Sequence, residues 1–238
     1  VGKRLIEQLK QQHQHLQQHL RLNVRVVAIA NSKQVALNEE GIDLSNWENT
    51  LKDAPVMKLN ELVQFIQEKN LRNSVFVDVT ANEDVSKVYA ALLQKSVSVV
   101  ACNKIAASSV YSNYEQLKNL AREFNTSFLF ETNVGAGLPV IGTLNDLMRS
   151  GDEVQKIQAV LSGTLNFVFN NYNGTKTFAS VVRQAQDEGY TEPDPRLDLG
   201  GTDVMRKILI LAREAGNKME MSDIANNVFL PGECMKGS

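Results

Sequence analysis

The sequence predicts an α/β protein in which helices cover a parallel sheet. Short apolar or β-branched runs recur at 24–30, 74–79, 96–101 and 127–131, each of a length typical of a buried strand. Helical segments separate the later runs, near 60–69, 82–94 and 111–124. Strands that alternate with helices in this way are typical of a parallel sheet with helices on its faces.

A helix is expected before the first strand. Leu5, Leu9, Leu16 and Leu20 fall near helical spacing, and the strand "VRVVAIA" follows at 24–30. The histidines of this helix, in "HQHLQQHL", lie among glutamines without a nearby carboxylate. We therefore interpret them as a solvated helix face and predict no metal there.

The pattern changes after Glu131. A Gly-rich turn at 132–140 leads to a helix near 139–149 and a strand near 153–161 that ends in "SGT". Helices near 164–171 and 177–188 follow, and a last helix begins at Thr202. The change predicts two domains, at 1–137 and 138–238.

The composition favours a protein that binds a small-molecule substrate. The chain has 238 residues, 43% of them hydrophobic, which is enough for a sizeable core. The net charge of −2 lacks the positive excess typical of nucleic-acid-binding proteins, and no run approaches the roughly 18 apolar residues of a membrane span. Cys102 and Cys234 lie far apart without metal-type spacing, so we expect a reducing, cytoplasmic environment.

Polar residues follow each strand at the edge where a parallel sheet binds ligands. They are Asn31, Ser32, Lys33, Thr80, Asn103 and Lys104, together with the 132–138 turn. Nucleotide folds usually place an acid after the second strand for the ribose hydroxyls, whereas this chain has Asn31. The missing carboxylate favours NADP over NAD; ordinary polar loops are the alternative. Val1-Gly2 would be the tail of a phosphate-binding loop at a helix N-terminus.

The stretch 190–214 carries an unusual number of charges into an apolar helix. At about 100° per residue, Lys207 shares an arc with Asp203, four residues earlier, and with Glu214. One interpretation is a paired lysine at the edge of the core. The other is a lysine aimed into a cleft and held by a carboxylate, as proton transfer requires.

The motifs "VVACNKIA", "NVGAGLPV", "LSGTLNFVF" and "GYTEPDPRLDLGGTDVMRKILILARE" resemble homoserine dehydrogenase, most nearly the form fused behind an aspartokinase. The resemblance implies a Rossmann-type NAD(P)-binding domain followed by an α+β catalytic and dimer-forming domain. It also implies interconversion of L-homoserine and L-aspartate 4-semialdehyde with NADP or NAD, on the route to threonine and methionine. A homo-oligomer and an attached aspartokinase are the implied partners, with no nucleic acid and no membrane.

The resemblance also implies roles for individual residues. Lys207 would be catalytic, and Glu192, Asp203, Asp198 and Lys104 would bind the substrate. Gly189 and Gly2 would lie at the cofactor, with Lys104 and the strand-end residues named above. A monovalent cation such as sodium would bind Glu131 and the carbonyls of Val134, Ala136 and Leu138; a helix-capping turn is the alternative.

The resemblance further implies that both domains are incomplete. The family's first strand and most of its Gly-rich loop would precede Val1, and a further segment would follow Ser238. We therefore expect either a gap beside the 24–30 strand or strands supplied by residues outside this numbering. Two other functions remain open: another amino-acid or semialdehyde dehydrogenase on the same fold, and a non-catalytic regulatory or dimerisation module. The retained Glu192, Asp203 and Lys207 argue against the module.

Overall fold

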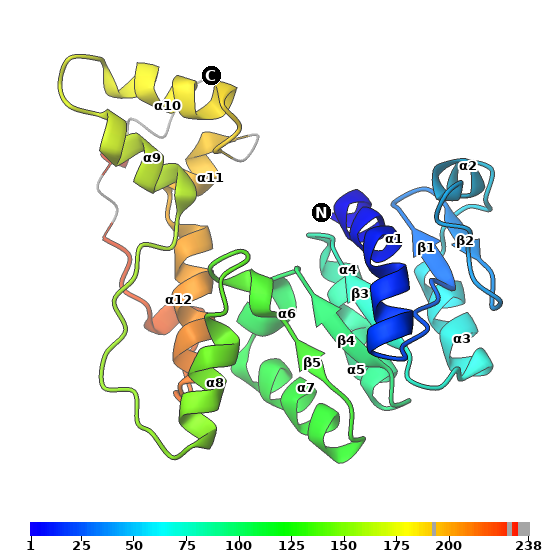
Figure 1. Ribbon diagram of the computed structural model, residues 1–238. Helices are drawn as coiled ribbons and strands as arrows, with labels where there is room; N and C mark the ends of the chain where they lie inside the picture. The colour runs from blue at the N-terminus through cyan, green and yellow to red at the C-terminus, as the bar shows by residue number, and fades with distance from the viewer. Residues whose placement is uncertain (192–193, 228–229, 233–238) are drawn as a thin grey trace. The chain divides into compact units, whose positions relative to one another are not determined.

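The computed structural model describes residues 1–191, 194–227 and 230–232 (Figure 1). It divides into two compact units. The first unit comprises residues 1–80, 84–100 and 120–128, and the second comprises residues 81–83, 101–119 and 129–238. Each unit is thus built from segments that are distant in the sequence.

The first unit begins with a helix and a hairpin. Helix α1 (Gly2–His19) leads to strand β1 (Ala28–Ala30), which pairs antiparallel with β2 (Val35–Leu37). Helices α2 (Trp47–Lys52) and α3 (Leu59–Lys69) follow. Ala36, Ile42 and Leu51 form a small core beneath the hairpin, against which Trp47 packs. Because β2 is so short, its apolar pattern did not predict a strand.

A three-stranded parallel sheet follows, in the order β3-β4-β5. Its strands are β3 (Val75–Asp78), β4 (Ser98–Ala101) and β5 (Phe128–Leu129). Helices α4 (Glu83–Lys87) and α5 (Tyr89–Leu93) connect the first two strands, and α6 (Ile105–Ser108) and α7 (Tyr111–Glu123) connect the last two (Figure 1). Tyr89, Leu92, Leu93 and Val99 are fully buried. The predicted α/β class is confirmed.

The prediction that the 24–30 run belongs to this sheet is wrong. Strand β1 pairs with β2 in a separate two-stranded sheet, and no ladder between described residues joins it to β3. A tight turn at 31–34 brings β2 beside β1, so the nearest segment in the chain supplies the partner. The break between the two sheets is where the sequence predicts a gap.

The second unit is mainly helical. After the short turn η1 (Glu131–Asn133), its elements are α8 (Ile141–Arg149), α9 (Gly163–Asn171), α10 (Phe178–Asp187), α11 (Pro195–Leu199), α12 (Thr202–Glu214) and η2 (Met221–Asp223). Helices α9 and α10 pack through Val168, Val181 and Ala185. Ser162 and Thr177 cap their N-termini by accepting backbone N–H bonds.

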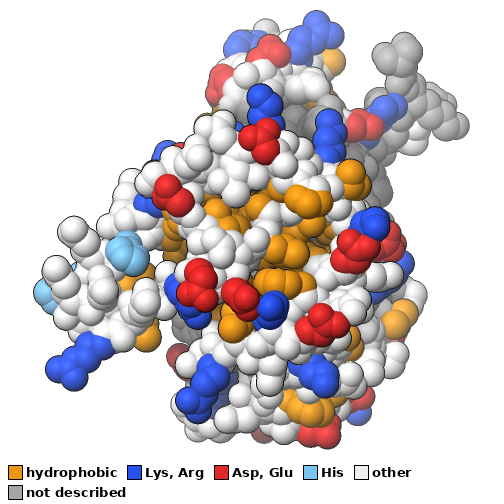
Figure 2. Space-filling model, turned by 90° about the vertical axis from the view of Figure 1, so that its right-hand side faces the viewer, with side chains coloured by type: hydrophobic (Ala, Val, Ile, Leu, Met, Phe, Trp, Pro, Cys, Tyr) orange, Lys and Arg blue, Asp and Glu red, His pale blue; other side chains and the backbone are white. Residues whose placement is uncertain are grey.

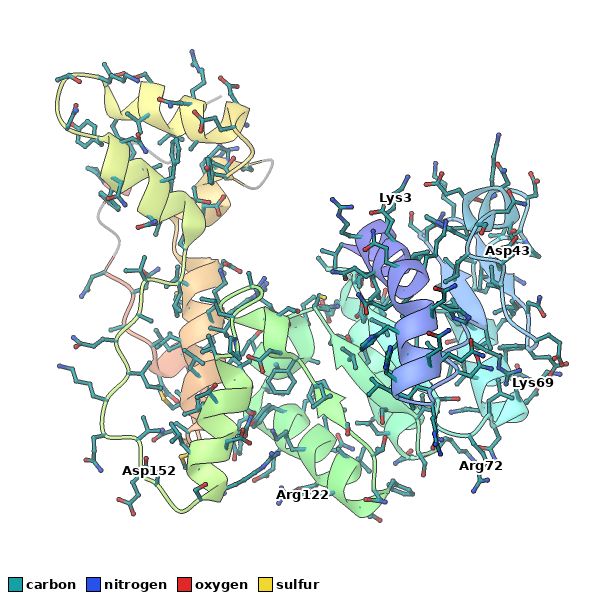
Figure 3. All side chains as sticks on the ribbon, viewed as in Figure 1. Lys3, Asp43, Lys69, Arg72, Arg122 and Asp152 are labelled. Carbon is teal, nitrogen blue, oxygen red and sulfur yellow. The ribbon has the colours of Figure 1, made fainter. Side chains whose placement is uncertain are left out.

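The segment 153–161 runs as unpaired chain between α8 and α9, beginning beside Asp152 (Figure 3). The sequence predicts a strand here, and that prediction is wrong for this structure. A strand needs a neighbour for its backbone N–H and C=O groups, and no described residue forms a ladder with this segment. Val160 accordingly remains 79% exposed.

Candidate active site

Lys207 and Asp203 lie together on the first turns of α12. The Lys207 Nζ is 2.6 Å from the Asp203 Oδ2 and donates to the Leu161 carbonyl at 2.7 Å. The Lys104 Nζ lies 3.4 Å from the other Asp203 oxygen, Oδ1. The structure therefore joins Lys104, Asp203 and Lys207, which the sequence had placed in one site.

Local structure brings these residues into place. Gly201 starts α12 at φ +77°, and a Cβ there would lie 3.2 Å from the Asn226 Oδ1. The helix dipole favours Asp203 in the first turn, and the spacing of four residues aligns it with Lys207. Buried Asn103 fixes the loop before Lys104, because its Nδ2 donates to the Asn82 carbonyl at 2.9 Å.

The charges around Asp203 keep it ionised. Burial raises the pKa of Asp203, but the hydrogen bond from Lys207 and the charge of Lys104 outweigh burial and lower it. Lys207 is 17% exposed, and two of its three N–H bonds point at Asp203 and Leu161. The third has no partner among the described residues, so the site can present one directed proton to a bound oxygen.

A second polar group lies at the start of α9. The Thr164 hydroxyl is 2.5 Å from the Tyr190 carbonyl and 2.9 Å from the Asp198 Oδ1. Leu161 lies in the chain that enters α9 and Thr164 lies in its first turn, so this short segment contacts both Lys207 and Asp198. Leu161 and Thr164 were not predicted as site residues. The small residues of "SGT" at a helix start were the available signal.

Two further predicted residues, Gly189 and Glu192, lie on either side of Tyr190 in the sequence. Glu192 lies outside the described residues. Gly189 follows the end of α10 at φ +77°, and its N–H bonds to the Gln186 carbonyl at 3.0 Å. This is the left-handed glycine that ends many helices. A contact between Gly189 and a cofactor stays a prediction.

Asn31 shapes the turn between β1 and β2. Its Oδ1 accepts from the backbone N–H of Lys33 at 2.7 Å and of Gln34 at 2.8 Å. Ser32 and Lys33 are exposed on this turn, and the residue at its start is the uncharged Asn31 rather than an acid. An exposed lysine on a turn without a carboxylate could bind the 2′-phosphate of NADP, because no negative charge repels the phosphate there.

The end of β3 is also held by a buried side chain. The Asp78 Oδ1 accepts from the Thr80 N–H at 2.7 Å, and the Tyr89 hydroxyl donates to the Asp78 Oδ2 at 2.5 Å. Gly2 lies close by, since a Cβ on it would be 3.3 Å from the Val79 side chain. Such close approach of a helix start is what a dinucleotide site requires.

The histidines of α1 are exposed on the surface (Figure 2). Among the described residues, no three His, Cys, Asp or Glu side chains gather as a metal site would require.

Glu131 caps α8. Its oxygens accept from the N–H groups of Ile141 at 2.8 Å and Gly142 at 2.6 Å. The Leu138 carbonyl accepts from Val140 at 2.9 Å, and Ala136 adopts φ +52° within the turn. These are the contacts of a helix-capping turn, which accounts for Glu131 without an ion.

The fold and the lysine–aspartate site are of the kind found in dinucleotide-binding oxidoreductases. Comparison with known proteins narrows the class. The family model "Homoserine dehydrogenase, NAD binding domain" matches residues 1–131, and "Homoserine dehydrogenase" matches residues 139–230. The chain belongs to the homoserine dehydrogenase family.

Named relatives agree with this assignment. The chain is 41% identical over 233 residues to a bifunctional aspartokinase/homoserine dehydrogenase 1 of Zea mays, covering 97% of this chain and 25% of that protein. It is 43% identical over 232 residues to the bifunctional enzyme of Haemophilus influenzae, covering 97% of this chain and 28% of that one. The chain thus spans about a quarter of the length of these relatives.

A solved structure shares the fold. A hyperthermophilic archaeal homoserine dehydrogenase in complex with NADPH superposes with a TM-score of 0.74 at 26% identity, covering 91% of this chain and 67% of that one. Among the described residues, no helix is both long and apolar enough to cross a bilayer.

Proposed function

We propose that the protein is an NADP-dependent homoserine dehydrogenase that interconverts L-homoserine and L-aspartate 4-semialdehyde. The observation that carries the proposal is Lys207, held by Asp203 and Leu161 with one N–H left for a substrate. The names of the relatives and the match to both family models support it.

Lys207 moves the proton in this reaction. Bound NAD(P) supplies the hydride chemistry. In the reductive direction, the protonated Lys207 gives its third N–H proton to the carbonyl oxygen of the semialdehyde as that oxygen becomes a hydroxyl, and in the reverse direction the neutral Lys207 amine takes the hydroxyl proton of homoserine. Asp203 holds the Lys207 nitrogen in place, and Lys104 adds positive charge beside the substrate. Glu192 and Asp203 would pair with the substrate ammonium group, with Asp198 nearby.

The substrate grip can be tested with an analogue that lacks the amino group. Glu192→Gln should raise KM for homoserine, because the ammonium loses a charged partner, and should leave KM for the des-amino analogue unchanged. Steady-state kinetics of both substrates measure the difference. If wild type and Glu192→Gln show the same preference between the two, the assignment of Glu192 is wrong.

The NADP preference is the finer part of the proposal. Ser32 and Lys33 would contact the 2′-phosphate, with Asn31 shaping their turn, and Gly2, Thr80, Asn103, Lys104 and Gly189 would complete the cofactor site. Lys33→Ala should weaken NADPH binding and spare NADH, because only NADPH carries the extra phosphate. Equilibrium binding of both nucleotides measures this. An equal loss for both would mean that Lys33 does not contact the 2′-phosphate.

Other properties follow from the family resemblance. We propose domains that meet near residue 138, assembly into a homo-oligomer, fusion to an aspartokinase and a reducing cytoplasmic location. Sodium at Glu131 stays a prediction of the resemblance, and no step depends on it.

The activity itself is tested by NADPH oxidation with aspartate semialdehyde, using the whole protein and Lys207→Ala. Equal rates for the two would contradict the proposed site.

A further inference from the structure

We propose that Glu214 is a positioning residue for Lys207. The two residues lie on the same arc of α12, two helical turns apart. Lys207 lies at the half-exposed start of the helix, and Glu214 lies at its buried end. The inference rests on the proposed function, since it assigns Glu214 a role in the reaction that Lys207 performs.

Glu214 is buried among donors from two other helices. Its side chain is 1% exposed, and Lys118 of α7 lies 3.0 Å from both of its oxygens. The Tyr114 hydroxyl, also on α7, donates to Oε1, and Asn145 of α8 donates to Oε2 at 2.8 Å. Burial and the charge of Glu214 raise the pKa of Tyr114 well above its usual range, so Tyr114 stays a neutral donor.

The neighbouring Arg213 fastens the same helix end to other segments. Its guanidinium is fully buried and donates to the carbonyls of Ala107 at 3.0 Å and Met219 at 2.8 Å. It also donates to the Glu220 carboxylate at 3.2 Å. Ala107 lies in α6, one turn after Lys104. The contact between Arg213 and Ala107 therefore also fixes the position of Lys104 relative to Asp203.

An α-helix transmits this constraint along its length, because each backbone hydrogen bond ties one turn to the next. The Lys207 nitrogen needs it, since its contacts to Asp203 and Leu161 are 2.6 and 2.7 Å long. A displacement of about 1 Å would break them, and errors of that size can lower a rate about 100-fold. A purely structural Glu214 would affect stability alone.

The first experiment compares Glu214→Gln with Glu115→Gln in the whole protein. Glutamine keeps the size of Glu214 but loses the charge that Lys118 pairs with. Glu115, on α7, is matched in charge but lies 45% exposed, 3.8 Å from Lys218. We expect Glu214→Gln to lower kcat roughly 10- to 100-fold per folded enzyme, with cofactor KM unchanged and the pH profile of kcat shifted. Glu115→Gln should change neither. An unshifted profile with unchanged kcat would overturn the proposal.

A double-mutant cycle isolates the route through Lys207. In the Lys207→Ala background, Glu214→Gln should lower the residual rate no further, although it should still lower Tm. An equal loss of rate in both backgrounds would overturn the proposal. If Glu214→Gln does not fold, Tyr114→Phe serves instead, since it removes one neutral donor. Tyr114→Phe should lower kcat less than Glu214→Gln would. In the Lys207→Ala background it should not lower the residual rate.

A substrate-independent readout separates this inference from the proposed function. Lysine 13Cε NMR at one fixed pH follows the surroundings of the Lys207 side chain, whose signal is assigned by its loss in Lys207→Arg. The 13Cε chemical shift should differ between wild type and Glu214→Gln, because the Lys207 nitrogen moves relative to Asp203 and Leu161, and identical chemical shifts would overturn the positioning role. If the chemical shift changes while wild type shows no homoserine dehydrogenase activity, the positioning role holds and the proposed function fails.

Discussion

The two halves of α12 use their charges differently. In the first half, Asp203 and Lys207 are partly exposed, and their contacts leave one Lys207 N–H without a partner among the described residues. In the second half, Arg213 and Glu214 are buried, and donors or acceptors from other segments surround each of them. Charges that are fully satisfied inside the protein stabilise one arrangement, whereas charges with spare bonding capacity can act on a ligand.

The difference matches the burial of apolar residues along the helix. Leu209, Ile210 and Leu211 are buried in the second half, while Val204 and Ile208 in the first half are only partly buried. Packing therefore anchors the helix at one end and leaves its start beside the site. The comparison predicts that changes to the charges of the first half affect catalysis directly and that changes to the apolar residues of the second half affect stability.

The largest expected effect is on catalysis. Lys207→Ala should lower turnover by about 10² to 10⁴ with cofactor affinity nearly unchanged, because the proton then has no positioned acceptor. Lys207→Arg should fail as well, since a guanidinium stays protonated. Steady-state kinetics and nucleotide binding measure both. A loss below about tenfold would remove Lys207 from the chemistry.

The next effect is on stability. Leu209→Ala should lower the free energy of unfolding by about 2–5 kcal/mol, because the side chain is fully buried and its removal leaves a cavity. Val204→Ala, in the first half, should cost about 1 kcal/mol or less. Urea unfolding of both variants tests the contrast. Equal losses would mean that packing is uniform along α12.

A smaller effect concerns pH. Because the folded state lowers the pKa of Asp203, its contribution to stability is fully present above the ordinary value of 3.8 and is lost as pH falls below it. Asp203→Asn should therefore reduce the pH dependence of unfolding in that acidic window and leave the remaining carboxylates to titrate. Chemical unfolding between about pH 2 and pH 5 measures this. Identical pH dependence in both proteins would contradict the ion pairs to Lys104 and Lys207.

The smallest effect is expected at Arg206, beside Lys207. Its side chain makes no ion pair with a described residue, so Arg206→Ala should change stability by less than about 0.5 kcal/mol and leave turnover near wild type. The variant is a matched control for Lys207→Ala, since it removes a positive charge from the same turn. A large loss of turnover would show that charge alone, rather than position, matters in this half.

Part of the site could be predicted because its geometry is local. Asp203 and Lys207 are four residues apart, and a helix fixes their relation wherever it lies. Leu161 could not be predicted as their partner, because a carbonyl 46 residues away reaches Lys207 only through the fold. Arg213 shows the same limit. Seven residues separate it from Arg206, so a helix places both on one side, yet the carbonyls of Ala107 and Met219 hold Arg213 in the interior.

Some of the strands could be predicted from the sequence and others could not. Runs at 74–79, 96–101 and 127–131 were recognised because short apolar segments between helices suit a parallel sheet. The runs at 24–30 and 153–161 have similar composition, but one pairs antiparallel in a separate sheet and the other forms no ladder among the described residues.

The sequence by itself determined the longer helices, such as those near 111–124 and from Thr202, and the spacing of Asp203 and Lys207, because helix hydrogen bonds join residues four apart. The tertiary structure decided which strands pair and which charges are buried, because the partners of a strand or a buried charge come from distant parts of the chain.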